Sequence, residues 1–188
     1  MTSPVHGESG SEPDTLVIRQ AMSDDAETLS ALAGRTFRDA YAAQSDPADL
    51  DDYVAEHFTV GLLSQQLQDS SIVHLLASVA GEPIGYAILR LGMPPDCVHG
   101  PRPVELGRLY LEQRVVGRGY GAALMQACLG EAARMGCETI WLGVWEENHR
   151  ARAFYKKWGF QDIGRYEFEI GGKVDHDPVM ARPVKPTE

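Results

Sequence analysis

The sequence lacks three features that would each assign it to a class of protein. Its three cysteines, Cys97, Cys128 and Cys137, form no CxxC pair, and an odd count at this spacing argues against a disulfide framework and a zinc site. No run of about 18 apolar residues occurs. A net charge of −10 leaves no basic excess for nucleic acid and would favour a cationic small molecule. We therefore expect reduced cysteines in a cytoplasmic protein that holds no metal, spans no membrane and binds no nucleic acid.

The length and the apolar content favour one compact domain. The chain has 188 residues, of which 44% are hydrophobic, and this is enough to bury a core without disulfide bonds or a structural metal. Its start, "MTSPVHGESGSE", is rich in Ser, Gly, Glu and Pro and has neither the basic start nor the apolar run of a signal peptide. We predict a disordered tail over residues 1–13 and a single domain over residues 14–184.

Apolar spacing and turn residues predict the order of the elements. A strand at 15–21 precedes a helix that Ser23 caps and that extends to Tyr41. The remaining predictions are helices at 46–58 and 61–68, a β-hairpin at 71–92, a strand at 104–112, a helix up to Met135, a buried strand at 139–145, a helix at 151–158, and strands at 160–172 and 177–184. This order predicts a mixed α/β sheet with helices on its faces.

The segment "VVGRGYGAALMQACL", residues 115–129, places Gly117, Gly119 and Gly121 between a strand and a helix. Such a turn directs backbone N–H groups and the positive end of the helix at one spot, which suits a pyrophosphate. A dinucleotide-binding turn, with Glu138 as the ribose ligand, is one interpretation. That fold opens a repeated strand-helix series, however, whereas antiparallel strands and acidic helices precede this turn.

Two segments carry a resemblance to the GCN5-related N-acetyltransferases. "LYLEQRVVGRGYGAALM" is similar to their pyrophosphate-binding motif, Q/R-x-x-G-x-G/A, with Val116 at the Gln/Arg position and Gly119 and Gly121 at the small positions. Val116 departs from the pattern, so backbone N–H groups and Arg118 would take over the role of that side chain. "WEENHRARAFYKKWGF" is similar to the downstream segment N-x-x-A-x-x-F-Y-x-x-x-G-F, matched by Asn148, Ala151, Phe154, Tyr155, Gly159 and Phe160.

The resemblance implies both a fold and a co-substrate. The fold is a mostly antiparallel sheet of about seven strands, with a parallel pair splayed at the acetyl-coenzyme A site and helices on both faces. The implied acetyl-coenzyme A contacts are Leu109, Tyr110, Leu111, Val116, Gly117, Arg118, Gly119, Tyr120, Gly121, Asn148 and Lys157. By itself, Asn148 is equally typical of a helix cap, and Lys157 of a solvated lysine.

The resemblance also implies two catalytic residues. Tyr155 matches the tyrosine that protonates the departing thiolate, although its place in an apolar helical stripe is also typical of a core tyrosine. Glu105 resembles the family's catalytic glutamate, and strand alternation would place it on one face with Leu109 and Leu111. An ion pair with Arg90 or in the neighbourhood of Arg108 is the alternative for Glu105.

Two further bases remain open. His74 and His99 are alternatives to Glu105, although neither comes with a partner spacing that indicates activation.

From Asp14 to Met180 the chain resembles the bacterial spermidine/spermine branch of the family. This resemblance implies direct attack by a primary amine, with a polyamine as the leading acceptor. Acidic residues near the start would receive it, with Asp49 and Glu56 as candidate ligands, or else they form a solvated face. Another small amine, a protein N-terminus, or a non-catalytic acyl-coenzyme A-binding module are alternatives. A homodimer is a family expectation.

Overall fold

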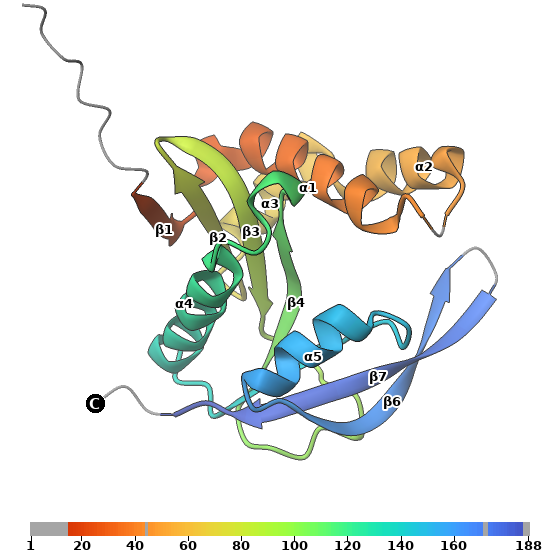
Figure 1. Cartoon of the computed structure of the whole chain (residues 1–188). Coiled ribbons are helices and arrows are strands. Elements are labelled where there is room, and N and C mark those ends of the chain that lie inside the picture. The colour runs from red at the N-terminus through yellow and green to blue at the C-terminus, as the bar shows by residue number, and fades with distance from the viewer. Residues whose placement is uncertain (1–14, 44, 171–172, 186–188) are drawn as a thin grey trace, which may run out of the picture.

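The computed structural model describes residues 15–43, 45–170 and 173–185, so the tail predicted at 1–13 lies outside the described residues. One seven-stranded sheet has the order β1-β2-β3-β4-β5-β7-β6 (Figure 1). Its strands are β1 (Leu16–Gln20), β2 (Ile72–Val79), β3 (Glu82–Arg90), β4 (Pro103–Leu111), β5 (Thr139–Gly143), β6 (Gln161–Ile170) and β7 (Lys173–Pro183). Neighbours are antiparallel except β4 and β5, so the predicted mixed sheet with one parallel pair is confirmed.

Helices cover both faces of the sheet. The helices are α1 (Ala26–Tyr41), α2 (Pro47–His57), α3 (Val60–Gln68), α4 (Tyr120–Arg134) and α5 (His149–Lys157). Side chains of α1, α2 and α3 form one core with β2 and β3, around residues such as Leu32, Phe37 and Tyr86. On the other face, α4 and α5 pack over a larger core that includes Leu124 and Ile140. Burial of this apolar surface is the main force that holds the helices to the sheet.

The predicted turns are confirmed where glycine adopts a left-handed backbone. Ala80 and Gly81 have positive φ angles of 49° and 78° in the β2–β3 hairpin. Gly136 follows α4 with φ 74°, and Gly159 follows α5 with φ 83°, as expected of glycines beyond helix ends.

The predicted cap at Ser23 is wrong. Ser23 opens a short 3-10 turn, Ser23–Asp25, and the carboxylate of Asp25 accepts a hydrogen bond of 2.7 Å from the Met22 N–H. An aspartate two residues along satisfies the free backbone donor in place of the serine hydroxyl, because the tighter turn brings its side chain back to the start.

Candidate active site

The parallel strands β4 and β5 separate after a short shared stretch. They pair only from Pro103 to Glu105 on β4, whereas the opposite edge of β4 stays paired with β3 as far as Leu111. Beyond β5, the Val144 N–H donates to the Pro178 carbonyl of β7. Within the described residues, no strand therefore pairs with the β5-side edge of β4 near Leu109. Such an edge offers backbone groups to an extended chain, as in strand addition.

A glycine turn leads from the end of β4 into α4. Gly117 and Gly119 have φ angles of 89° and 87°, and Gly119 is the residue that immediately precedes α4. A residue with a Cβ is strained at such angles. Among the described residues, no backbone carbonyl accepts from the N–H groups of Tyr120 or Gly121. These free donors and the positive helix end are features that could hold an anion.

This geometry changes the motif assignment made from the sequence. Gly121 has no positive φ, and a Cβ there would make ordinary contact with Leu111 at 3.6 Å. The two glycines that the turn requires are thus Gly117 and Gly119, each two residues earlier than its predicted counterpart. In that register the Gln/Arg position of the motif is Arg114, so the pattern is complete and Val116 is a loop residue.

Two arginines lie at the turn. Arg118 is exposed, and Arg114, half of whose side chain is exposed, forms ion pairs with Glu112 at 2.6 Å and Glu82 at 3.1 Å. The cations of this turn are therefore Arg118 together with an arginine that is already held in place by carboxylates. The sequence could have indicated Arg114, because the motif Q/R-x-x-G-x-G/A also fits when it is aligned two residues earlier in the chain.

Helix α5 brings its own candidates to the same place. The Asn148 side chain accepts a hydrogen bond of 3.0 Å from the Ala151 N–H, which confirms Asn148 as the helix cap. Tyr155 packs edge-on against Phe154 and Phe160, and burial raises the pKa of its phenol. The ring of Phe154 lies 3.9 Å from where a Cβ of Gly121 would be, so α5 borders the glycine turn. Lys157, the last residue of α5, is exposed.

The face on which Glu105 lies differs from the prediction. Leu89 pairs with Leu106 and Ile88 with Arg108, so Gly107 is an extra residue that forms a β-bulge. The bulge shifts by one residue the alternation of side chains between the two faces of the sheet. Leu109 consequently packs on the α4 side, whereas Glu105 faces the side of α1–α3.

The carboxylate of Glu105 lies next to a cation. Its Oε2 atom is 3.9 Å from Nη1 of Arg90, so the alternative ion pair exists, although it is long. About a third of each side chain is exposed, with 30% for both, which leaves the carboxylate accessible.

The acidic residues of α2 lie on its exposed surface. Asp46 caps the helix through a 2.8 Å hydrogen bond to the Ala48 N–H, and Asp51 pairs with Arg38 at 2.7 Å. Asp49 and Glu56 are exposed. No described contact joins them to Tyr155 or Glu105.

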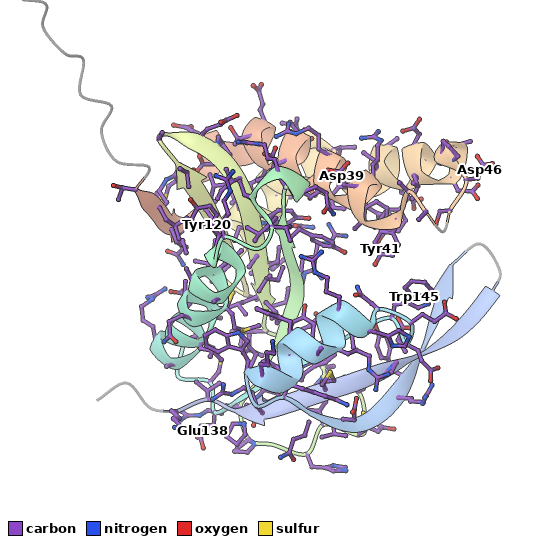
Figure 2. The ribbon with its side chains drawn as sticks, in the orientation of Figure 1. Asp39, Tyr41, Asp46, Tyr120, Glu138 and Trp145 are labelled. Atoms are coloured by element: carbon purple, nitrogen blue, oxygen red, sulfur yellow. The ribbon has the colours of Figure 1, made fainter. Side chains whose placement is uncertain are left out.

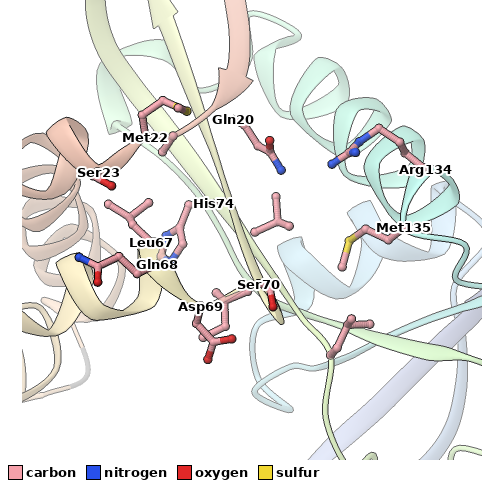
Figure 3. Close-up of a pocket in the computed structure, with 14 residues that line it drawn as sticks. Gln20, Met22, Ser23, Leu67, Gln68, Asp69, Ser70, His74, Arg134 and Met135 are labelled. Carbon is pink, nitrogen blue, oxygen red and sulfur yellow. The ribbon is translucent and has the colours of Figure 1, made fainter.

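The alternative bases lie elsewhere. His99 is exposed, whereas His74 is 2% exposed and neither of its ring nitrogens has a hydrogen-bond partner within the part of the chain described. Burial, assisted by Arg90 and Arg108, lowers the pKa of His74 to about 4. A pocket of about 470 Å³ adjoins it, between the end of β1, α3 and the end of α4 (Figure 3).

Sequence reasoning missed one tyrosine that lies near the tyrosines of the site. Tyr41, at the end of α1, lies on the side that faces α5 (Figure 2). Its proximity adds to burial in raising the pKa of Tyr110, Tyr155 and Tyr166. In the sequence Tyr41 is one more member of an apolar helical stripe, so nothing there distinguishes it from the core.

No helix among the described residues is long and apolar enough to cross a bilayer. In the same residues, no cluster of three or more His, Cys, Asp or Glu side chains could hold a metal ion. The three cysteines are free thiols, of which Cys128 and Cys137 are buried.

The splayed strands, the glycine turn and the neighbouring helix with its tyrosine define an acyl-coenzyme A-dependent acyltransferase. The model of the acetyltransferase (GNAT) family matches residues 29–160. The chain belongs to this family, and acetyl-coenzyme A is its co-substrate.

Relatives and solved structures agree with this assignment. An uncharacterized N-acetyltransferase of Mycobacterium tuberculosis is 36% identical over 84% of this chain and 97% of its own. A spermine/spermidine N(1)-acetyltransferase of Bacillus subtilis is 29% identical over 57% of this chain and 74% of its own. The crystal structure of the PaiA N-acetyltransferase of Thermoplasma acidophilum in complex with coenzyme A has the same fold, with a TM-score of 0.74 and 22% identity, covering 90% of this chain and 99% of that one.

Proposed function

We propose that this N-acetyltransferase transfers acetyl to a primary amine by direct attack, with Tyr155 as the acid and Glu105 as the base. The observation that carries the proposal is the convergence of the open edge of β4, the Gly117–Gly119 turn and the partly buried Tyr155. Three free thiols fit the reducing cytoplasm, where we place the protein.

The coenzyme would be held mainly by backbone. Leu109, Tyr110 and Leu111 pair with its pantetheine arm, and the N–H groups from Gly117 to Gly121 bind its pyrophosphate. An N–H group at Leu109 or Leu111 polarises the thioester carbonyl. Arg114 and Arg118 add positive charge beside the turn. Asn148 and Lys157 would add contacts to the coenzyme arm and the ribose phosphate.

The neutral amine attacks the thioester carbonyl. A C–N bond forms, the C–S bond breaks, the amine proton passes to Glu105 directly or through water, and Tyr155 gives its proton to the departing thiolate. Burial suits Tyr155 for this step, because a raised pKa keeps the phenol protonated and ready to donate.

A polyamine is one candidate acceptor. Its support is the partial match to the Bacillus subtilis spermine/spermidine N(1)-acetyltransferase and the exposed carboxylates of α2, among them Asp49 and Glu56. Another small amine or a protein N-terminus would use the same chemistry.

The decisive experiment measures coenzyme A release with spermidine, spermine, amino acids and aminoglycosides, for wild type and Tyr155→Phe. We expect Tyr155→Phe to lower kcat about a hundredfold, the usual scale for loss of a positioned acid. Tyr86→Phe, which removes another buried phenol, is the matched control and should retain activity. An unchanged rate in Tyr155→Phe at every pH would refute the assignment of the acid. Acetyl-coenzyme A binding without turnover on any amine would instead identify a non-catalytic binding module.

A further inference from the structure

Three basic side chains lie on the face of the sheet opposite to α4, on three neighbouring strands. His74 of β2 pairs with Ile88 of β3, and Ile88 pairs with Arg108 of β4. Arg90 ends β3, beside Glu105. Arg90 and Arg108 both lower the pKa of His74, and Arg108 also opposes the charge on Arg90, so the three groups share one electrostatic environment. We call His74, Arg90 and Arg108 the basic row.

The basic row has too few carboxylates. Arg90 has one long ion pair, 3.9 Å to Glu105, and burial is the main cause that lowers its pKa. Arg108 forms no ion pair with any of the described residues, and its guanidinium lies 4.1 Å from the ring of Phe58. Two arginines thus face one carboxylate on these strands. A partly buried cation without a counter-charge is costly, so such a pair indicates an anion that is supplied from outside.

The bulge at Gly107 makes room for the basic row. A Cβ at Gly107 would lie 2.8 Å from Nη1 of Arg90 and 3.5 Å from Oε1 of Glu105. The bulge also turns Arg108 to the side of Glu105 and Tyr110, away from the side chain of Leu109. The residue that precedes Leu109 and shares the face of Glu105 is therefore an arginine.

The coenzyme cannot supply the missing anion. Its nearest charged group, the pyrophosphate, would sit at Gly117–Gly119, beyond the far end of β4. The acetyl end, which would lie near Leu109, is neutral. The other substrate is the remaining source.

We infer, on the basis of the proposed function, that the acceptor amine carries a carboxylate or similar anionic group that binds Arg108, with Arg90 beside it. Guanidinium groups bind carboxylates through two parallel hydrogen bonds, which fixes orientation as well as charge. A carboxylate on Arg108 leaves Glu105 available for the proton of the amine. The same arginines repel the additional ammonium groups of a polyamine, so the two acceptor classes give opposite predictions.

The test compares acceptors that share a skeleton and differ in charge. One set is alanine, alaninamide and 1,2-diaminopropane, and a longer set is 5-aminopentanoate, pentylamine and 1,5-diaminopentane. With the full chain and saturating acetyl-coenzyme A, we expect the carboxylate of at least one set to exceed its neutral partner in kcat/KM by about tenfold or more, the scale of a charged hydrogen bond. Arg108→Gln should remove that advantage by raising the KM for the carboxylate to about that of its neutral partner.

Arg134→Gln is the matched control, because it removes a positive charge from the end of α4, where Arg134 pairs with Glu131. A diamine that reacts fastest, and faster still with Arg108→Gln, would overturn the inference in favour of a polyamine. If Arg108→Gln lowered kcat/KM equally for all three members of a set, the inference would also be overturned, because Arg108 would then have only a structural role.

A failure of the proposed function gives a different result. If no amine is acetylated, calorimetry in the presence of coenzyme A decides the inference. Binding of the carboxylate amine to wild type but not to Arg108→Gln would support an anion site, and equal binding or none would refute it.

Discussion

Burial determines the protonation of single residues on both faces of the sheet. It raises the pKa of Tyr110 and Tyr155, and it raises that of Tyr166 to about 12. These phenols are therefore neutral at physiological pH, so Tyr155 can donate a proton but cannot accept one. The same effect on a basic group acts in the opposite direction, because burial disfavours the charged imidazole of His74.

His74 should make the fold sensitive to mild acid. Its pKa is about 4 in the folded chain and 6.5 in the unfolded chain, so the unfolded state binds the proton first. The stability that this difference contributes, about 3 kcal/mol at most, is present above pH 6.5 and lost as the pH falls toward 4. We expect His74→Leu to show a smaller fall in the free energy of unfolding between pH 7 and pH 5, measured in urea.

The control for this prediction is His99→Leu, which alters an exposed histidine. It should follow the wild-type pH dependence. If the free energy of unfolding of His74→Leu fell with pH as steeply as that of wild type, other groups would be the cause of the acid sensitivity.

At the scale of the element, the sequence predicts most helices and strands because their apolar faces have a clear period. The stripe from Leu29 to Phe37 and the buried "TIWLG" of β5 are examples. The face of Glu105 was not predictable in this way, because a bulge at Gly107 is set by pairing with β3 and not by the residues of β4 alone. The motif gave Tyr155, whereas the roles of Tyr41 and Arg108 depend on which elements meet.

The cap of α5 can be separated from any contact of Asn148 with the coenzyme. Asn148→Ala removes the 3.0 Å hydrogen bond to the Ala151 N–H and should cost about 1 kcal/mol of unfolding free energy. Asn148→Asp retains the cap and should restore stability, as measured by thermal unfolding. If Asn148 also binds the coenzyme arm, both variants should bind acetyl-coenzyme A more weakly than wild type. Wild-type affinity in Asn148→Asp would mean that Asn148 serves only as the helix cap.

At the scale of the whole molecule, the net negative charge contrasts with two arginines on the sheet face beside Glu105. The chain carries a net charge of −10, yet the sheet face beside Glu105 holds Arg90 and Arg108. An acidic exterior attracts cations in general, but the arginines next to the site select against them. Composition could predict the attraction of cations by the net charge. The position of the two arginines beside Glu105 could be known only from the register of the strands.

Neutralising α2 tests whether the exterior recruits a polyamine. If it does, Asp49→Asn with Glu56→Gln should raise the KM for spermidine several-fold at low salt, and the difference should shrink as ionic strength screens the charges. Asp96→Asn with Glu138→Gln removes two exposed carboxylates elsewhere and should have little effect. Unchanged spermidine kinetics in the α2 variant would exclude α2 as the polyamine surface.

The short parallel pairing of β4 with β5 divides the sheet into two leaves. One leaf is β1–β4 and the other is β5, β7 and β6, and among the strands that the structure describes the two leaves pair over Pro103–Glu105 of β4. A bound pantetheine arm would act as an additional strand across this seam, so coenzyme binding should couple the two leaves into one cooperative unit. Amide hydrogen exchange would then slow in both leaves together, including in strands that never touch the coenzyme.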